Sequence, residues 1–293
     1  MKFIFNSIVV GRESMKIAYL GPKGTFSEEA AKIYIDSIVC ENDNINFEEK
    51  MFCNIESVIN AVNKGEADEG IVPLENSIEG SVTSTIDTLI FDDGLYIKCE
   101  LVLKVSQNLM AKKGVELKDV EKIVSHLQGI NQCRGHISPL EVPTIAVSST
   151  AQAARMVSES EENIAAIATK RAAEVYGLNI LKEDIQDDNL NSTRFVVISK
   201  NVTPLKKDLK TSIAFTLDDD NSPGSLYRVL DILNIYEINM IKIESRPAKT
   251  KLGTYVFYID LIAADQTDLE DAIKMIKRKV SFFKFLGSYP SIS

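Results

Sequence analysis

Apolar residues along the first two thirds of the chain follow two different periods. Short apolar runs typical of buried strands occur at Ile17–Leu20, Gly70–Val72, Ile123–Ser125, Ile164–Ala168 and Phe195–Ile198. Between these runs, apolar residues recur at helical spacing, most clearly over residues 150–158 and 169–176, the second segment ending at a glycine. Alternating strands and helices predict an α/β fold with a largely parallel sheet.

The pattern changes after a lysine-rich polar segment at residues 200–210, which we interpret as a linker. Residues 211–289 then predict the order β-α-β-β-α-β, which is typical of a ferredoxin-like fold. The expected organisation is an N-terminal extension at 1–15, a first region at 16–199, the linker, and a C-terminal domain at 211–289.

Composition and charge narrow the possible functions. The net charge of −9 argues against nucleic acid or an anionic membrane as the main partner. Four scattered cysteines and two histidines give no metal-binding or disulfide pattern, so we expect reduced thiols, no metal and a cytoplasmic location. No apolar run approaches the roughly 20 residues of a membrane helix. The second methionine, Met15, directly precedes the first strand, which suggests that residues 1–14 lie upstream of the physiological start.

Hydroxyl and amide side chains follow several predicted strands. Thr25 with Glu28, and Ser149 with Gln152, have the spacing of helix capping boxes. The other two clusters are Glu75-Asn76-Ser77 and Ser125 with Gln132, whereas Ser192-Thr193-Arg194 lies at the start of a predicted strand and would face them. Each cluster alone is explained by a helix cap or a strand start. Because the carboxyl ends of parallel strands meet at one edge of a sheet, the clusters together predict a shared cleft rich in neutral hydrogen-bond donors.

Five of these segments together resemble the motifs of the prephenate dehydratase family, from Lys16 to about Tyr289. They are GPKGTFSEEAA, VPLENSIEG, SHLQGINQCR, SSTAQAA and NSTRFVVI, in this order. SPGSLYRVL and INMIKIESRP resemble an ACT regulatory domain. The resemblance implies a two-lobed catalytic region like a type II periplasmic binding protein. It also implies a lyase that converts prephenate to phenylpyruvate in L-phenylalanine biosynthesis without a cofactor, with feedback by L-phenylalanine in a homodimer or homotetramer.

The resemblance also assigns residues. The implied catalytic residues are Thr193, Arg194, Glu75, Asn76 and Ser77. The implied substrate-binding residues are Thr25, Ser125, Gln132, Ser149 and Phe195. The implied L-phenylalanine site comprises Gly224, Ser225, Leu226, Glu244, Ser245 and Arg246.

The chemistry of the implied reaction suggests separate roles for two neighbouring residues. Prephenate needs a hydrogen-bond donor at the departing hydroxyl, and Thr193 offers one. Arg194 offers a bidentate fork for a carboxylate. The carboxylate that leaves as carbon dioxide should lie among weakly binding neutral groups, because strong pairing would stabilise it in the ground state.

Alternatives remain open at this stage. Arogenate dehydratase differs only in the amine of its substrate, and a small-molecule sensor could use the same fold. The sequence also departs from the family at Leu127, Gly129 and Glu237, where proline, alanine and glycine are usual. A glycine at the last position suits a positive φ, so we expect Glu237 to be strained and phenylalanine control to be less secure than catalysis.

Overall fold

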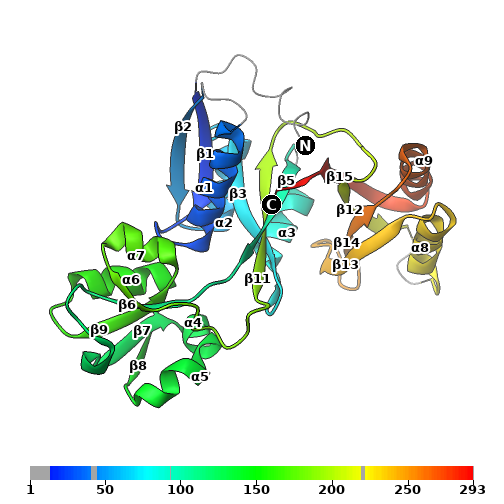
Figure 1. The fold of residues 1–293 in the computed structure, drawn as a ribbon. Helices are drawn as coiled ribbons and strands as arrows, with labels where there is room; N and C mark the ends of the chain where they lie inside the picture. The colour runs from blue at the N-terminus through cyan, green and yellow to red at the C-terminus, as the bar shows by residue number, and fades with distance from the viewer. Residues whose placement is uncertain (1–13, 41–44, 93, 219–221, 293) are drawn as a thin grey trace.

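A computed structural model describes residues 14–40, 45–92, 94–218 and 222–292. Within these ranges the chain forms three sheets, each with its own helices, and Figure 1 shows the three groups of strands and helices beside one another. None of the helices in the described ranges is long and apolar enough to cross a membrane. The predicted N-terminal extension lies outside the described residues as far as residue 13. Met15, which we had assigned to that extension, is instead buried in the first strand.

The first sheet has the order β16-β5-β11-β3-β1-β2, with β4 paired to β3. Its strands are β1 (Ser14–Leu20), β2 (Asn46–Phe52), β3 (Glu69–Asn76), β4 (Gly80–Ser81), β5 (Tyr96–Lys104), β11 (Ser192–Ser199) and β16 (Ser291–Ile292). Helices α1 (Phe26–Val39), α2 (Ile55–Asn63) and α3 (Thr83–Phe91) pack against it. Strand β1 runs parallel to β2 and β3, whereas β11 is antiparallel to both β3 and β5.

The second sheet has the order β10-β6-β9-β7-β8. Its strands are β6 (Asn108–Ala111), β7 (Lys122–His126), β8 (Thr144–Val147), β9 (Ile164–Ala168) and β10 (Asn179–Lys182). Its helices are α4 (Leu127–Gln132), α5 (Arg134–Ile137), α6 (Thr150–Glu159) and α7 (Lys170–Tyr176). The chain passes between the first and second sheets twice, from β5 to β6 and from β10 to β11 (Figure 1). The first two sheets therefore form two lobes joined by two crossing segments.

The third sheet is antiparallel and has the order β13-β14-β12-β15. Strands β12 (Lys210–Leu217), β13 (Asn239–Pro247), β14 (Tyr255–Ile262) and β15 (Val280–Tyr289) alternate with helices α8 (Ser225–Ile235) and α9 (Gln266–Lys277) in the predicted order β-α-β-β-α-β. We call this unit the C-terminal sheet.

The C-terminal sheet is covered on both faces. Ile213, Phe215 and Ile259 pack with apolar residues of α8 and α9. Ala214 and Tyr258, which alternate with them along the strands, belong instead to the core of the first lobe. Packing on both faces explains why β12 is almost entirely buried, and it fixes the sheet against the first lobe.

Several elements differ from the sequence-based expectation. The first sheet is mixed rather than largely parallel, because β11 returns from the second lobe in the opposite direction. Strands β2 and β5 escaped prediction because charged residues interrupt their apolar pattern. Residues 201–209 contain no regular element but bind the C-terminal sheet, and Lys206 N–H donates to Ser288 Oγ at 3.2 Å. One expectation is confirmed, because Glu237 has a φ of 51°, a conformation that suits glycine.

Candidate active site

A cavity of about 270 Å³ lies between the two lobes. The first lobe contributes the start of α1, the last residue of β3 and the start of β11. The second lobe contributes the segments that begin α4 and α6. The lining residues are Thr25, Phe26, Ser27, Asn76, Val105, Gln107, His126, Gln128, Gly129, Gln132, Ser148, Ser149, Thr150, Asn191 and Thr193. None of these is an aspartate, glutamate, lysine or arginine, so the cavity presents hydroxyl, amide and imidazole groups.

Two of the longer helices begin at the cavity. Thr25 Oγ1 accepts the backbone N–H of Glu28 at 3.4 Å at the start of α1. Ser149 Oγ accepts the N–H of Gln152 at 3.0 Å at the start of α6. Each cap satisfies one N–H of its first turn, and helix geometry leaves others without intrahelical acceptors. Together with the helix dipole, these donors favour an anion in the cavity without a charged side chain.

Thr193 and Asn76 form the best-defined polar pair of the cavity. The two residues are paired on neighbouring strands, and Asn76 Nδ2 donates to Thr193 Oγ1 at 3.0 Å. The amide is itself held, because its Oδ1 accepts the N–H groups of Ile78 and Glu79, both at 3.0 Å. Since Thr193 accepts from Asn76, its own hydroxyl proton is directed away from that amide and can be donated to a bound ligand.

His126 also lines the cavity, although it was not among the predicted site residues. Its Nδ1 accepts the backbone N–H of Gln128 at 3.3 Å and caps helix α4. That hydrogen bond requires an unprotonated Nδ1, so the neutral imidazole carries its proton on Nε2 as a donor. Its place at the end of strand β7, in the same motif as Gln132, was the signal that could have identified it.

The predicted substrate-binding residues divide into two groups. Thr25, Gln132 and Ser149 line the cavity. Ser125 is fully buried, and its Oγ donates to the carbonyl of Ile167 at 2.7 Å, so it supports the second sheet. Phe195 lies in the apolar core of the first lobe.

Ser77 also lies outside the cavity lining. Its Oγ accepts the N–H of Ser192 at 2.9 Å and donates to the carbonyl of Leu190 at 3.1 Å. These bonds fasten the loop after β3 to the start of β11, next to Thr193. Ser77, Ser125 and Phe195 therefore do not line the cavity. Their contacts instead hold the strands and loops that carry the lining residues.

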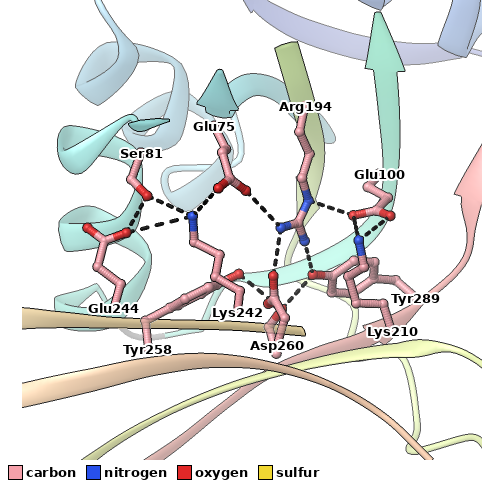
Figure 2. Close-up of polar contacts among 11 residues, drawn as sticks. Glu75, Ser81, Glu100, Arg194, Lys210, Lys242, Glu244, Tyr258, Asp260 and Tyr289 are labelled. Atoms are coloured by element: carbon pink, nitrogen blue, oxygen red, sulfur yellow. Dashed lines mark hydrogen bonds and ion pairs between the residues drawn. The ribbon is translucent and has the colours of Figure 1, made fainter. Parts of the chain in front are cut away.

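Arg194 requires a correction, because its side chain points away from the cavity. Its Nε donates to Glu100 Oε2 at 2.6 Å, its Nη1 to Asp260 Oδ2 at 2.6 Å, and its Nη2 to the Tyr289 hydroxyl at 2.9 Å (Figure 2). Strand alternation places it on the face opposite Thr193. With every side of the guanidinium already bound, it cannot be the carboxylate fork of the cavity.

The buried position of Arg194 affects its ionisation. Burial by itself lowers its pKa, but Tyr289, Asp260 and Glu100 favour the charged form more strongly, so the pKa lies above the ordinary arginine value. Burial has the opposite effect on the phenol of Tyr289: it raises the pKa, and the charge of Asp260 raises it further. The guanidinium is therefore a permanent cation between two carboxylates and a neutral phenol.

The prediction that Glu75 belongs to the cavity is also wrong, because Glu75 is not among the lining residues. Its carboxylate lies 2.7 Å from Lys242 Nζ and 3.6 Å from Arg194 Nη1, on the side of the C-terminal sheet (Figure 2). Within the ENS motif, only Asn76 reaches the cavity. Glu75, Asn76 and Ser77 were predicted to act together, but Glu75 and Asn76 are neighbours in a strand and so point to opposite faces.

The residues expected to bind L-phenylalanine do not form one pocket in this single chain. Gly224 has a φ of 81° and precedes α8, which Ser225 begins. Glu244 and Arg246, on β13, instead contact Ser81 and Asp87 of the first lobe.

Leu226 and Ser245, the other two residues expected to bind L-phenylalanine, do not share these contacts with the first lobe. Leu226 packs on the core of the C-terminal sheet. Ser245 is exposed between Glu244 and Arg246.

Comparison with known proteins assigns the family. Residues 17–203 match the family model described as prephenate dehydratase. The chain is 40% identical over 278 residues to prephenate dehydratase of Methanocaldococcus jannaschii, covering 94% of this chain and 97% of that protein. It is 34% identical over 301 residues to arogenate dehydratase 2 of Petunia hybrida, covering 95% and 72%.

Solved structures agree with this assignment. Prephenate dehydratase of Arthrobacter aurescens in complex with L-Phe superposes with a TM-score of 0.82 at 33% identity, covering 94% of this chain and 90% of that chain. GqqA, described as a novel type of quorum quenching acylase, also superposes with a TM-score of 0.82, at 27% identity and with 94% and 98% covered. The family model covers residues 17–203, and the sequence relatives and solved structures extend the similarity to 94% of the chain, which belongs to the prephenate dehydratase family.

Proposed function

We propose that the cavity between the lobes converts prephenate to phenylpyruvate, releasing water and carbon dioxide. The observation that carries this proposal is the Thr193–Asn76 pair, which presents a hydroxyl donor in a cavity with no charged lining residue. The identity of 40% to the Methanocaldococcus jannaschii enzyme, against 34% to the Petunia arogenate dehydratase, favours prephenate as the substrate.

The reaction requires a hydroxyl group to depart while a ring carboxylate leaves as carbon dioxide and the ring becomes aromatic. Negative charge develops on the departing oxygen, and a donor already aimed at that oxygen stabilises the transition state most. Thr193 Oγ1 accepts a hydrogen bond from Asn76 and donates one to the departing oxygen while keeping its proton. The departing hydroxide takes up one proton, which comes from the solvent, and leaves as water.

The two carboxylates of the substrate need different environments. The side-chain carboxylate is bound by the free N–H groups at the starts of α1 and α6. The departing carboxylate faces neutral groups such as Gln132 and His126. A lysine or arginine there would stabilise this carboxylate before it leaves and raise the barrier.

The test is phenylpyruvate formation from prephenate, assayed beside arogenate under the same conditions. We expect turnover of prephenate that is lost in Thr193→Ala, with kcat/KM higher for prephenate than for arogenate. Preferential turnover of arogenate would reassign the substrate. Binding of prephenate without turnover by the wild-type protein would instead support the sensor alternative.

We further propose that the C-terminal sheet is an ACT domain that binds L-phenylalanine in a homodimer or larger homo-oligomer of a cytoplasmic enzyme. Support comes from the β-α-β-β-α-β order and from the Arthrobacter aurescens relative, whose structure is described as a complex with L-Phe. The outer strand β13 also exposes Ile241 and Ile243, which suits pairing with a second copy.

Two measurements test this regulatory proposal. Calorimetry should detect L-phenylalanine binding to the full chain, and sedimentation should give a mass of at least twice 32.5 kDa. Replacing Ile243 with Lys should favour the monomer and weaken L-phenylalanine binding. A wild-type monomer that binds no L-phenylalanine would overturn the proposal while leaving the catalytic assignment intact.

A further inference from the structure

Two successive residue pairs join strands β3 and β11 of the first sheet, and their side chains point to opposite faces of that sheet. Strands β3 and β11 pair Asn76 with Thr193 and Glu75 with Arg194. Asn76 and Thr193 line the cavity, whereas Glu75 and Arg194 face the C-terminal sheet. Each cavity residue is thus bonded through one peptide unit to a charged residue on the opposite face.

The pairing of these strands is interrupted beside the two pairs. The register shifts between Arg194 and Phe195, because Arg194 pairs with Glu75 while Phe195 pairs with Pro73. An irregularity of this kind weakens the local ladder of backbone hydrogen bonds and redirects side chains. The ladder alone therefore holds Thr193 and Asn76 less firmly than it holds the rest of β11.

Side chains of the C-terminal sheet compensate at this point. Asp260, fully buried on β14, binds Arg194 at 2.6 Å, and Ser212 Oγ donates to the other oxygen of Asp260 at 2.5 Å. Lys242 on β13 binds Glu75 at 2.7 Å and is itself held by Ser81 Oγ, also at 2.7 Å. Figure 2 shows the contacts of Arg194 with Asp260 and of Glu75 with Lys242 in one cluster between β3, β11 and the C-terminal sheet.

Another pair of charges joins the same two units without reaching a cavity strand. Arg246 on β13 binds both carboxylate oxygens of Asp87, at 2.7 and 3.2 Å. Asp87 belongs to helix α3, which contributes no residue to the cavity lining. This pair holds the C-terminal sheet to the first lobe. Its other ion pairs within the described residues are Arg246 with Glu244 at 3.8 Å and Asp87 with Lys249 at 3.7 Å, and neither of these partners lies on β3 or β11. Asp87 is therefore a matched control for Asp260 and Lys242.

We propose that Arg194 and Glu75 are positioning residues through which Asp260 and Lys242 of the C-terminal sheet set the Thr193–Asn76 pair for catalysis. This inference rests on the proposed dehydratase function. Asp260 and Lys242 lie outside the cavity lining, so their substitution should change the chemical step more than substrate binding.

The test compares Asp260→Asn with Asp87→Asn in the full-length protein. Both substitutions remove one carboxylate charge and nearly preserve shape. Asp260→Asn should lower kcat about tenfold, equivalent to about 1.4 kcal/mol, with KM changed less than about twofold. Asp87→Asn should keep kcat within about twofold of wild type. Lys242→Met is a second variant, with an expected loss of kcat like that of Asp260→Asn, and it decides the matter if Asp260→Asn fails to fold.

A second readout does not depend on activity. The side-chain amide signals of Asn76 in ¹H–¹⁵N spectra should shift in Asp260→Asn and Lys242→Met but remain in place in Asp87→Asn. Unchanged Asn76 signals in the first two variants would overturn the inference, as would an equal loss of kcat in Asp87→Asn. A wild-type protein that fails to convert prephenate would overturn the proposed function instead, and the amide signals would still test the positioning role.

Discussion

The two faces of strands β3 and β11 carry polar groups of opposite character. On the cavity face, Thr193 and Asn76 are neutral, partly exposed, and joined by one hydrogen bond of 3.0 Å. On the other face, Arg194 is bound on three sides by groups at 2.6 to 2.9 Å. A site that must bind and release a ligand keeps its donors available, whereas a structural cluster satisfies every charge internally. The number of bound partners therefore distinguishes Arg194 from Thr193, although the two are neighbours in one strand.

The largest effect should come from the cavity face. Thr193→Ala removes the donor at the departing oxygen and should lower kcat about 10²- to 10³-fold with little change in KM. Stability should change little, because the hydroxyl is partly exposed. Steady-state kinetics and thermal unfolding of the same preparation check both statements. A folded variant with nearly wild-type kcat would remove Thr193 from the mechanism.

The opposite face should respond through stability. Arg194→Ala leaves Asp260 and Glu100 buried without their common partner, and it should lower the free energy of unfolding by about 3–5 kcal/mol. Chemical denaturation measures this loss, and Arg194→Lys should retain part of the stability by keeping the charge. If Arg194→Ala raised only KM and left stability unchanged, the assignment of the two faces would be reversed.

A substitution away from both faces gives a baseline for stability effects. Glu237 lies between α8 and β13 with a φ of 51°, a conformation that costs a side chain more than it costs glycine. Glu237→Gly should raise the free energy of unfolding by about 0.5–1 kcal/mol, after allowance for the greater flexibility of glycine in the unfolded chain. The expected change in prephenate turnover is none, as measured in the same kinetic assay. Destabilisation by the glycine would show that the glutamate side chain contributes an interaction that offsets its strain.

The smallest effect concerns His126, the only histidine among the residues that line the cavity. Its Nδ1 accepts the N–H of Gln128 at the start of α4, and the amide oxygen of a glutamine can accept the same hydrogen bond. His126→Gln should therefore change kcat less than about twofold, as measured in the same kinetic assay. A loss of kcat as large as that of Thr193→Ala would show that the imidazole takes a direct part in the reaction.

Much of the fold could be read from local patterns. Segments such as Ile164–Ala168 and Thr150–Ser158 were predictable, because a short apolar run or a helical period fixes each element without distant contacts. Strand β2 was not, because it lies at the edge of its sheet and its charged residues are largely exposed. Strand β5 was not, because its charged Glu100 is buried with partners from distant parts of the chain, Arg194 and Lys210. The antiparallel course of β11 also depends on a return from the second lobe, which no local pattern encodes.

The sequence by itself determined which residues are chemically able to act, and it indicated a neutral cleft formed by hydroxyl and amide groups at strand ends. It also determined that Thr193 and Arg194 must point to opposite faces, since they are consecutive in a strand. Only the tertiary structure decided which face borders the cavity and which borders the C-terminal sheet. The physical reason is that Asp260 and Tyr289, which bind Arg194, are 66 and 95 residues away along the chain.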